Sequence, residues 1–199
     1  MLYRMLEENV VPLFYERNEA GIPSGWTAKV RASMTRLTLR YSSERMMRQY
    51  LEKLYRPAAR AYRKRSADGG RLAGALAEWQ ARLEEGWKDL RLVRMNVSRE
   101  GETWNFSVEA YLGELPPDDV RVELYADPLP EEETGAGEEG RPERMEMERL
   151  GPLAGAVNGF VFGAKVAAAR AAEDYTPRIV PYHPEAFVPM EEGHILWMR

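Results

Sequence analysis

The apolar residues of this chain change their spacing near residue 90. Before that point they recur every three or four residues, as in the stripe Leu72, Leu76, Trp79 and Leu83, which is the spacing of a helix with one apolar face. From Leu90 onward, apolar and polar residues alternate, which is the period of strands that bury one face. Two periods in two separate blocks predict an α+β protein, with a helical segment followed by antiparallel sheets.

We therefore predict two domains, a helical segment over residues 1–87 and a sheet domain over residues 88–199. Residues 25–55 of the first domain contain two amphipathic helical patterns. Ser42 is expected to cap the second helix, because its hydroxyl can accept a hydrogen bond from a free backbone N–H of the first turn. Gly86 is expected to end the last helix.

The sheet domain is expected to contain seven short strands separated by turns. This number and spacing suggest two antiparallel sheets packed as a sandwich, immunoglobulin-like in kind. The acidic segment 128–144 is rich in glycine and proline. It is predicted to be a flexible loop between two strands, because it cannot bury enough apolar surface to offset the entropy of ordering it.

Composition narrows the class of protein. The chain has no cysteine, which removes disulfides and thiolate chemistry, and no apolar run is long enough to cross a bilayer. Charged residues follow Met1 at once, without the apolar stretch of a signal peptide. We therefore expect a cytoplasmic protein without a membrane partner.

The charge is divided unevenly along the chain. Residues 1–65 hold 14 Lys and Arg and 6 Asp and Glu, a net charge of +8, whereas the remainder holds 14 and 26, a net charge of −12. A basic half can bind nucleic acid. The preferred interpretation is that the basic half is attracted to the acidic half or docks on another domain, so no nucleic-acid partner is expected.

The residue identities within 25–55 go beyond a helical hairpin. A tryptophan is followed by a helical pattern that has a basic and a small residue near its middle. The next six residues are a basic residue, an aromatic residue, two serines, an acidic residue and an arginine. A second helical pattern then contains Gln-Tyr and ends near a tyrosine. This order resembles the C-terminal helices of the glycogen and α-glucan phosphorylases. The residues that carry the resemblance are Trp26, Arg31, Ser33, Arg40, Tyr41, Ser42, Ser43, Glu44, Arg45, Gln49, Tyr50 and Tyr55.

Both ends of the chain resemble the same family. Residues Leu2 to Arg17 are similar to the segment that leads into those helices. Residues Glu173 to Tyr182 and Ile195 to Trp197 resemble the tail of the shorter bacterial α-glucan (maltodextrin) phosphorylases. The chain is therefore identified as resembling the C-terminal portion of a bacterial phosphorylase of the short type.

The resemblance implies a parent enzyme with two Rossmann domains. Such an enzyme transfers a glucosyl unit from an α-1,4-glucan to phosphate and gives glucose 1-phosphate. Its pyridoxal phosphate is held on a lysine in a Gly-rich, Met-Lys-containing segment that this sequence lacks. The resemblance thus implies no cofactor in this chain, a scaffolding role, inactivity of the chain alone, and the remaining phosphorylase domains as partners.

No catalytic, cofactor-binding or metal-binding residue is predicted in this chain. His183 and His194 have no partner at metal-ligand spacing, so a structural or surface role is favoured. Ser42 and Ser43 have no histidine nearby in the pattern that would make one of them a nucleophile.

The alternative interpretation is a free-standing module that binds an α-glucan or a protein. Tyr111, Tyr125 and Trp197 could stack on sugar rings, although such residues also fill strand faces and domain contacts. The helical segment needs cover for its apolar faces, which predicts a homodimer or packing of these helices against the sandwich. The side chains concerned are Trp26, Val30, Met34, Met47 and Leu51.

Overall fold

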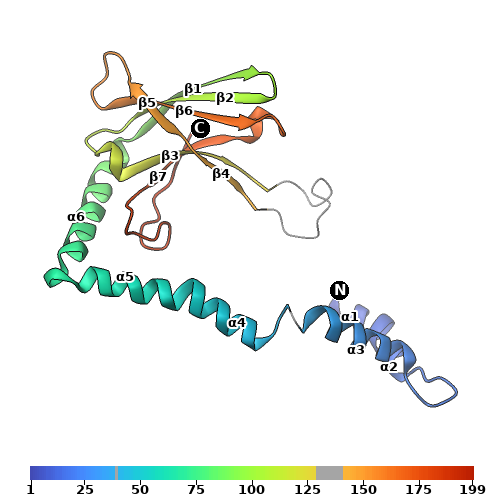
Figure 1. Cartoon of the computed structure of the whole chain (residues 1–199). Coiled ribbons are helices and arrows are strands. Elements are labelled where there is room, and N and C mark those ends of the chain that lie inside the picture. Colours follow the sequence, from blue (N-terminus) through green and yellow to red (C-terminus); the bar gives the residue numbers. More distant parts are fainter. Residues whose placement is uncertain (39, 129–140) are drawn as a thin grey trace. The chain divides into compact units, whose positions relative to one another are not determined.

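The computed structural model describes residues 1–38, 40–128 and 141–199 (Figure 1). They form two units, Met1–Lys64 and Arg65–Arg199. Helices come first and antiparallel sheets follow, so the predicted α+β class is confirmed. The domain boundary at 87/88 stays a prediction, and most of the predicted loop 128–144 lies outside the described residues.

The first unit is helical. Ser42 caps α4 (Ser43–Tyr50) as expected, because its Oγ accepts a hydrogen bond from the Arg45 N–H at 3.2 Å. The last helix of this stretch, α5 (Arg56–Ser66), includes the boundary between the units at residues 64 and 65. The helices are α1 (Leu2–Met5), the π-helix η1 (Leu6–Val10), α2 (Val11–Tyr15), α3 (Ser24–Leu37), α4 (Ser43–Tyr50), the π-helix η2 (Leu51–Tyr55) and α5 (Arg56–Ser66).

The helical unit has little internal packing. The ring of Phe14 in α2 meets Trp26 in α3 edge-on, with the ring centroids 5.5 Å apart. None of the described residues from 1 to 64 is buried. Val30, Met34, Met47 and Leu51, four of the five side chains expected to need cover, are exposed, and Trp26 is half-buried. The described residues of this unit therefore form no hydrophobic core of their own.

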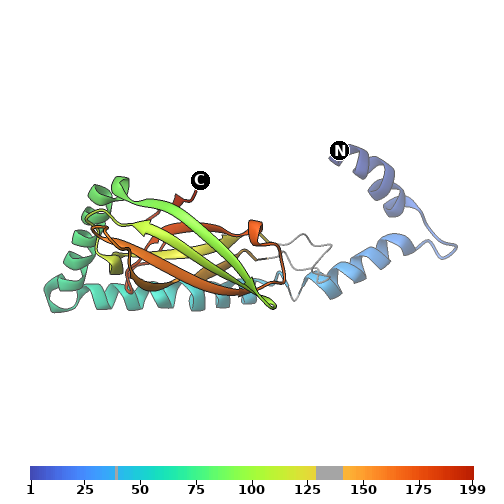
Figure 2. The same ribbon diagram turned by 90° about the horizontal axis from the view of Figure 1, so that it is seen from above.

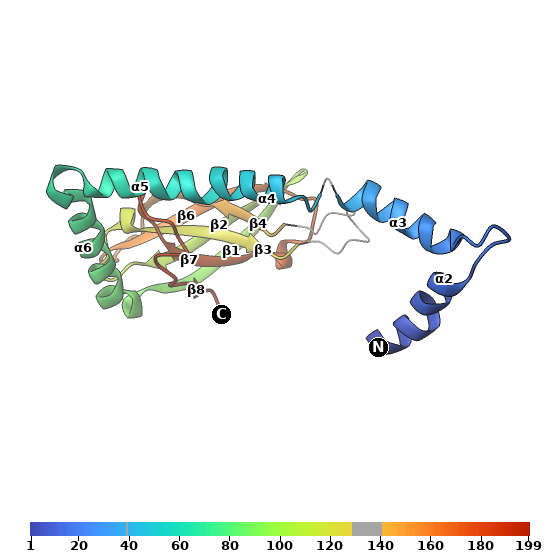
Figure 3. The same ribbon diagram turned by 90° about the horizontal axis from the view of Figure 1, so that it is seen from below.

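The second unit begins with the short helix η3 (Asp68–Gly70), then α6 (Arg71–Gly86) and the short helix η4 (Trp87–Asp89). Two antiparallel four-stranded sheets follow, in the orders β1-β2-β6-β5 and β4-β3-β7-β8. Figures 2 and 3 show the same ribbon from above and from below. The strands are β1 (Arg91–Glu100), β2 (Thr103–Tyr111), β3 (Val120–Ala126), β4 (Glu143–Glu146), β5 (Glu148–Pro152), β6 (Gly159–Ala167), β7 (Thr176–Pro181) and β8 (Leu196–Trp197).

Eight strands occur in the described residues, one more than the sequence predicted. The extra strand arises because the stretch 143–152 changes sheets. β4 pairs with β3 in the second sheet, and β5 pairs with β6 in the first. Met147 lies between them, is buried, and still donates its N–H to the Val122 carbonyl at 2.9 Å. Continuous alternation in the sequence therefore covers two strands with different partners.

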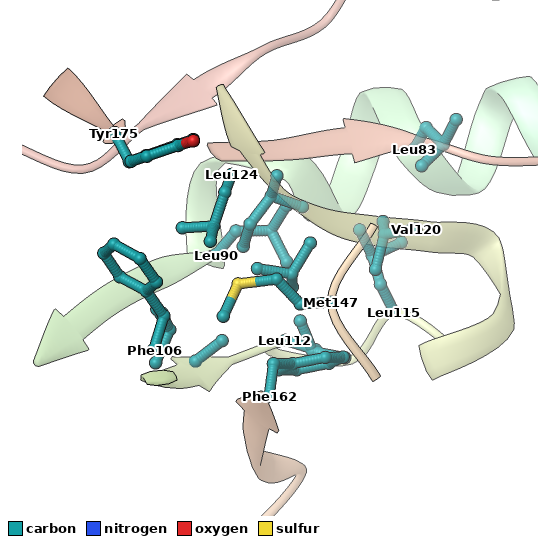
Figure 4. Close-up of a cluster of buried hydrophobic side chains, with 14 of the residues drawn as sticks. Leu83, Leu90, Phe106, Leu112, Leu115, Val120, Leu124, Met147, Phe162 and Tyr175 are labelled. Atoms are coloured by element: carbon teal, nitrogen blue, oxygen red, sulfur yellow. The ribbon is translucent and has the colours of Figure 1, made fainter. Parts of the chain in front are cut away.

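The core lies between the two sheets and includes one face of α6 (Figure 4). The predicted stripe of α6 is confirmed, because Leu76, Trp79 and Leu83 are buried and Leu72 packs against them. Phe106 in β2 and Tyr175 before β7 meet with ring centroids 5.5 Å apart. No helix in the described parts of the chain has the length and apolar character needed to span a membrane.

Candidate functional site

The outer face of the second sheet holds a group of charged and aromatic side chains. Val122 and Leu124 of β3 are buried in the core. The residues that alternate with them along the strand, Glu123 and Tyr125, therefore face away from the core. In the strand register, Glu123 lies opposite Arg178 of β7, and Arg178 lies opposite Trp197 of β8. These residues come together only because three strands distant in sequence are neighbours.

Arg178 is the centre of this group. It is 7% exposed, and its Nε and Nη2 both donate hydrogen bonds to Glu123 Oε2, at 3.0 and 2.8 Å. Its guanidinium carbon lies 4.6 Å from the ring centroid of Tyr125 and 5.1 Å from that of Trp197. The buried charge is therefore both paired and stacked, as a buried arginine requires.

The structure brings together two of the three aromatic residues that the sequence nominated for sugar stacking. Tyr125 and Trp197 meet edge-on at 5.2 Å, and both also contact Arg178. Tyr111 is the last residue of β2 in the other sheet. The sequence analysis missed Arg178, although a single charged residue among the mostly apolar residues of β7 is a signal that could have found it.

A cavity of about 410 Å³ lies between this sheet face and the C-terminal segment. The Arg121 guanidinium lies 3.5 Å from the ring centroid of Tyr182, and its Nη1 is 3.1 Å from Glu146 Oε2. Arg121 Nε is buried without a hydrogen-bond partner among the described residues. The cavity thus offers donors to a ligand. Its polar lining includes Arg121, Glu123, Arg144, Arg178, His183 and His194.

Both histidines pack on tryptophans. His183 lies 5.5 Å from Trp79 between ring centroids, and its Nδ1 accepts a hydrogen bond from the Glu185 N–H at 3.1 Å. His194 lies 5.0 Å from Trp87, with Nδ1 2.5 Å from Glu192 Oε1. Within the described ranges, no group of three or more His, Cys, Asp or Glu side chains could hold a metal ion.

The C-terminal segment is tied to the end of α5 by an ion pair. Arg65 Nη1 and Nη2 lie 2.6 and 2.8 Å from the two carboxylate oxygens of Glu191, which also accepts the Phe187 N–H at 2.8 Å. The hydrogen bond from Arg65 lowers the pKa of Glu191, and the same hydrogen bond raises the pKa of Arg65.

Tyr175, which lies before β7, also has a shifted pKa. Burial of the side chain and, second to it, a hydrogen bond to Glu143 raise the pKa of Tyr175 to about 12.

The sheet domain matches a known protein family. Residues 87–199 match the family model described as the glycogen phosphorylase C-terminal domain. This chain belongs to that family. The resemblance drawn from residues 25–55 and from the two ends is thereby confirmed.

Curated relatives of the glycogen phosphorylase family extend the similarity into the helices. Glycogen phosphorylase of Mycobacterium tuberculosis is 29% identical over 201 residues, which cover 92% of this chain and 21% of that protein. Maltodextrin phosphorylase of Thermococcus litoralis is 27% identical over 62% of this chain and 14% of its own length. Glycogen phosphorylase of Aquifex aeolicus is 37% identical over 27% of this chain. The chain spans about a fifth of the length of the first of these relatives.

Proposed function

We propose that this chain forms the C-terminal scaffold of an α-glucan phosphorylase and is inactive alone. The observation that carries the proposal is similarity over 92% of this chain to a glycogen phosphorylase of which it spans 21%. The helical unit agrees with it, because its described residues bury no side chain and leave apolar faces to be covered.

The whole protein would transfer a glucosyl unit from an α-1,4-glucan to phosphate. Pyridoxal phosphate would supply a phosphate group for acid–base work in that protein. A lysine that carries it in a Schiff base needs a shielded pocket. The lysines of this chain do not fit that role, because each is exposed: Lys29, Lys53, Lys64, Lys88 and Lys165. This exposure supports our placing the cofactor in the remaining domains, and no chemical step is assigned to residues of this chain.

The remaining phosphorylase domains are the proposed partners of the helical unit. In the parent, two Rossmann domains would form the catalytic cleft, and α3 and α4 would pack on the second of them. Without these domains, the chain would form a homodimer through the same apolar faces. The sheet domain would be an immunoglobulin-like sandwich, and the parent would be cytoplasmic.

Two assays test the proposal. The purified chain is incubated with glycogen and phosphate, and release of glucose 1-phosphate is measured; any release by the chain alone would contradict its predicted inactivity. In the second assay, the region that matches this chain is removed from the M. tuberculosis relative. We expect the truncated protein to lose phosphorolysis, and full activity after truncation would rule out the scaffolding role.

The second candidate function is a free-standing module that binds a glucan or a protein. The cavities on the outer faces of both sheets favour it. The intact mass of the protein in its source cells separates the two candidates. A band several times larger than this chain supports the phosphorylase scaffold, whereas a band at the size of this chain supports the module.

A further inference from the structure

We infer that the outer face of the first sheet is a binding groove for a neutral oligosaccharide, an α-glucan chain. The side chains of this face themselves favour a neutral ligand that is rich in hydroxyl groups. The identity of the sugar rests on the proposed function.

The groove crosses all four strands of the first sheet. Phe106 and Val108 of β2 are buried in the core, so Asn105 and Ser107 face away from it. The strand register places their neighbours in two adjacent rows on the same face. One row is Asn96, Ser107, Gly163 and Glu148, and the other is Ser98, Asn105 and Lys165. We call this surface the polar groove.

The polar groove is hollow at its centre. Its cavity measures about 560 Å³, within the range of roughly 300–1,000 Å³ that is usual for ligand pockets. Gly163 has no side chain, and the side chain of Leu150 occupies the space above it, because a Cβ at Gly163 would lie 2.7 Å from Leu150 Cδ1. Leu150 is itself 63% exposed and gives the groove an apolar wall for the C–H face of a sugar ring.

Asn105 indicates what the ligand must offer. Its Oδ1 is buried and has no hydrogen-bond partner among the described residues, while its Nδ2 donates to Glu100 Oε2 at 3.4 Å. A buried acceptor without a partner is costly, so an O–H or N–H from a bound molecule would stabilise it. The hydroxyl groups of a sugar are such donors.

The surrounding groups favour a neutral ligand over a charged one. Asparagine and serine side chains both donate and accept hydrogen bonds, as sugar hydroxyls do. The positive charge of Lys165 balances the negative charge of one carboxylate in the lining. The other carboxylate, that of Glu146, is paired with Arg121, with Oε2 3.1 Å from Arg121 Nη1. The charges around the groove therefore nearly balance, and no strong electrostatic potential of one sign would attract an anion or a cation.

Tyr111 lies on the same face of β2 as Ser107, because the two residues are separated by an even number of positions. Its ring lies over Gly159, where a Cβ would be 3.3 Å from Tyr111 Cε1. An aromatic surface of this kind can stack on a sugar ring. Of the three aromatic residues nominated from the sequence, Tyr111 is therefore the one that shares a sheet face with the groove.

The test is calorimetric titration of the full chain with maltoheptaose. The first variant is Asn105→Ala, which removes the amide oxygen that has no hydrogen-bond partner among the described residues. The second is Leu150→Ala, which removes an exposed apolar side chain of the groove and leaves the buried core unchanged. Asn9→Ala is the matched control, because Asn9 is an exposed asparagine in η1, outside the groove. Thermal unfolding of each variant checks that the fold is retained.

We expect maltoheptaose to bind the unaltered chain and the Asn9→Ala control equally. Binding should weaken about fivefold to tenfold in Asn105→Ala, since one hydrogen bond is lost, and measurably in Leu150→Ala. No binding by the unaltered chain, or unchanged affinity in either groove variant, would overturn the inference. Either result would leave the phosphorylase scaffold standing, because the truncation assay tests it separately.

Discussion

At the scale of single residues, Arg178 shows how a charge is accommodated in a small sheet domain. Its strand, β7, is buried along nearly its whole length, so the guanidinium has little access to water. Glu123 neutralises it, and Tyr125 and Trp197 cover its faces. Burying a charge is tolerated only when such partners are present, and removing one partner leaves the other uncompensated.

Arg178→Ala is expected to lower the free energy of unfolding by about 3 kcal/mol, because the half-buried Glu123 would be left without its partner. The control is Arg71→Ala in α6, where the ion pair with Asp68 is exposed and worth less than about 1 kcal/mol. Urea denaturation followed by tryptophan fluorescence measures both. Equal losses in the two variants would show that the pair has no special role.

At the scale of elements, α6 ends where the core requires it to end. Gly86 is the last residue of the helix, but its φ of −91° is an ordinary right-handed value, so the helix does not end through a left-handed glycine. The reason for glycine is contact. A Cβ at this position would lie 2.7 Å from both Cγ and Cδ2 of Leu115, which is buried.

Gly86→Ala and Gly74→Ala make a matched pair within α6. We expect Gly86→Ala to destabilise the protein by about 1–3 kcal/mol, since Leu115 must move in a packed core. Gly74 is exposed and has open space around it, so Gly74→Ala should stabilise the helix by about 0.5–1 kcal/mol. Thermal unfolding of both variants checks the opposite signs, and destabilisation by Gly74→Ala would refute this explanation.

At the scale of the whole molecule, the two units differ in how much they bury. All the buried core residues of the described chain belong to Arg65–Arg199, where α6 and the two sheets share one cluster. The helices of Met1–Lys64 expose most of their apolar side chains. Stability therefore resides in the second unit, and association is expected to depend on the first.

A protein shortened to residues 65–199 should fold and stay monomeric, because it retains the whole buried cluster. The full chain should form dimers or larger species through the exposed faces of α3 and α4. Sedimentation measures the two masses, and circular dichroism measures their unfolding. A monomeric full chain, or an unfolded 65–199 protein, would contradict this division.

The sequence by itself determined the order of helices and strands, the buried stripe of α6, the cap at Ser42 and the family. These follow from local periodicity, from one residue's hydrogen bond to its own helix, and from residue identities in order. The tertiary structure alone decided the change of sheet at Met147, the enclosure of Arg178 and the polar groove around Asn105. Each of these depends on which distant strands become neighbours, and pairing between strands is set by long-range packing that the alternation of one strand does not record.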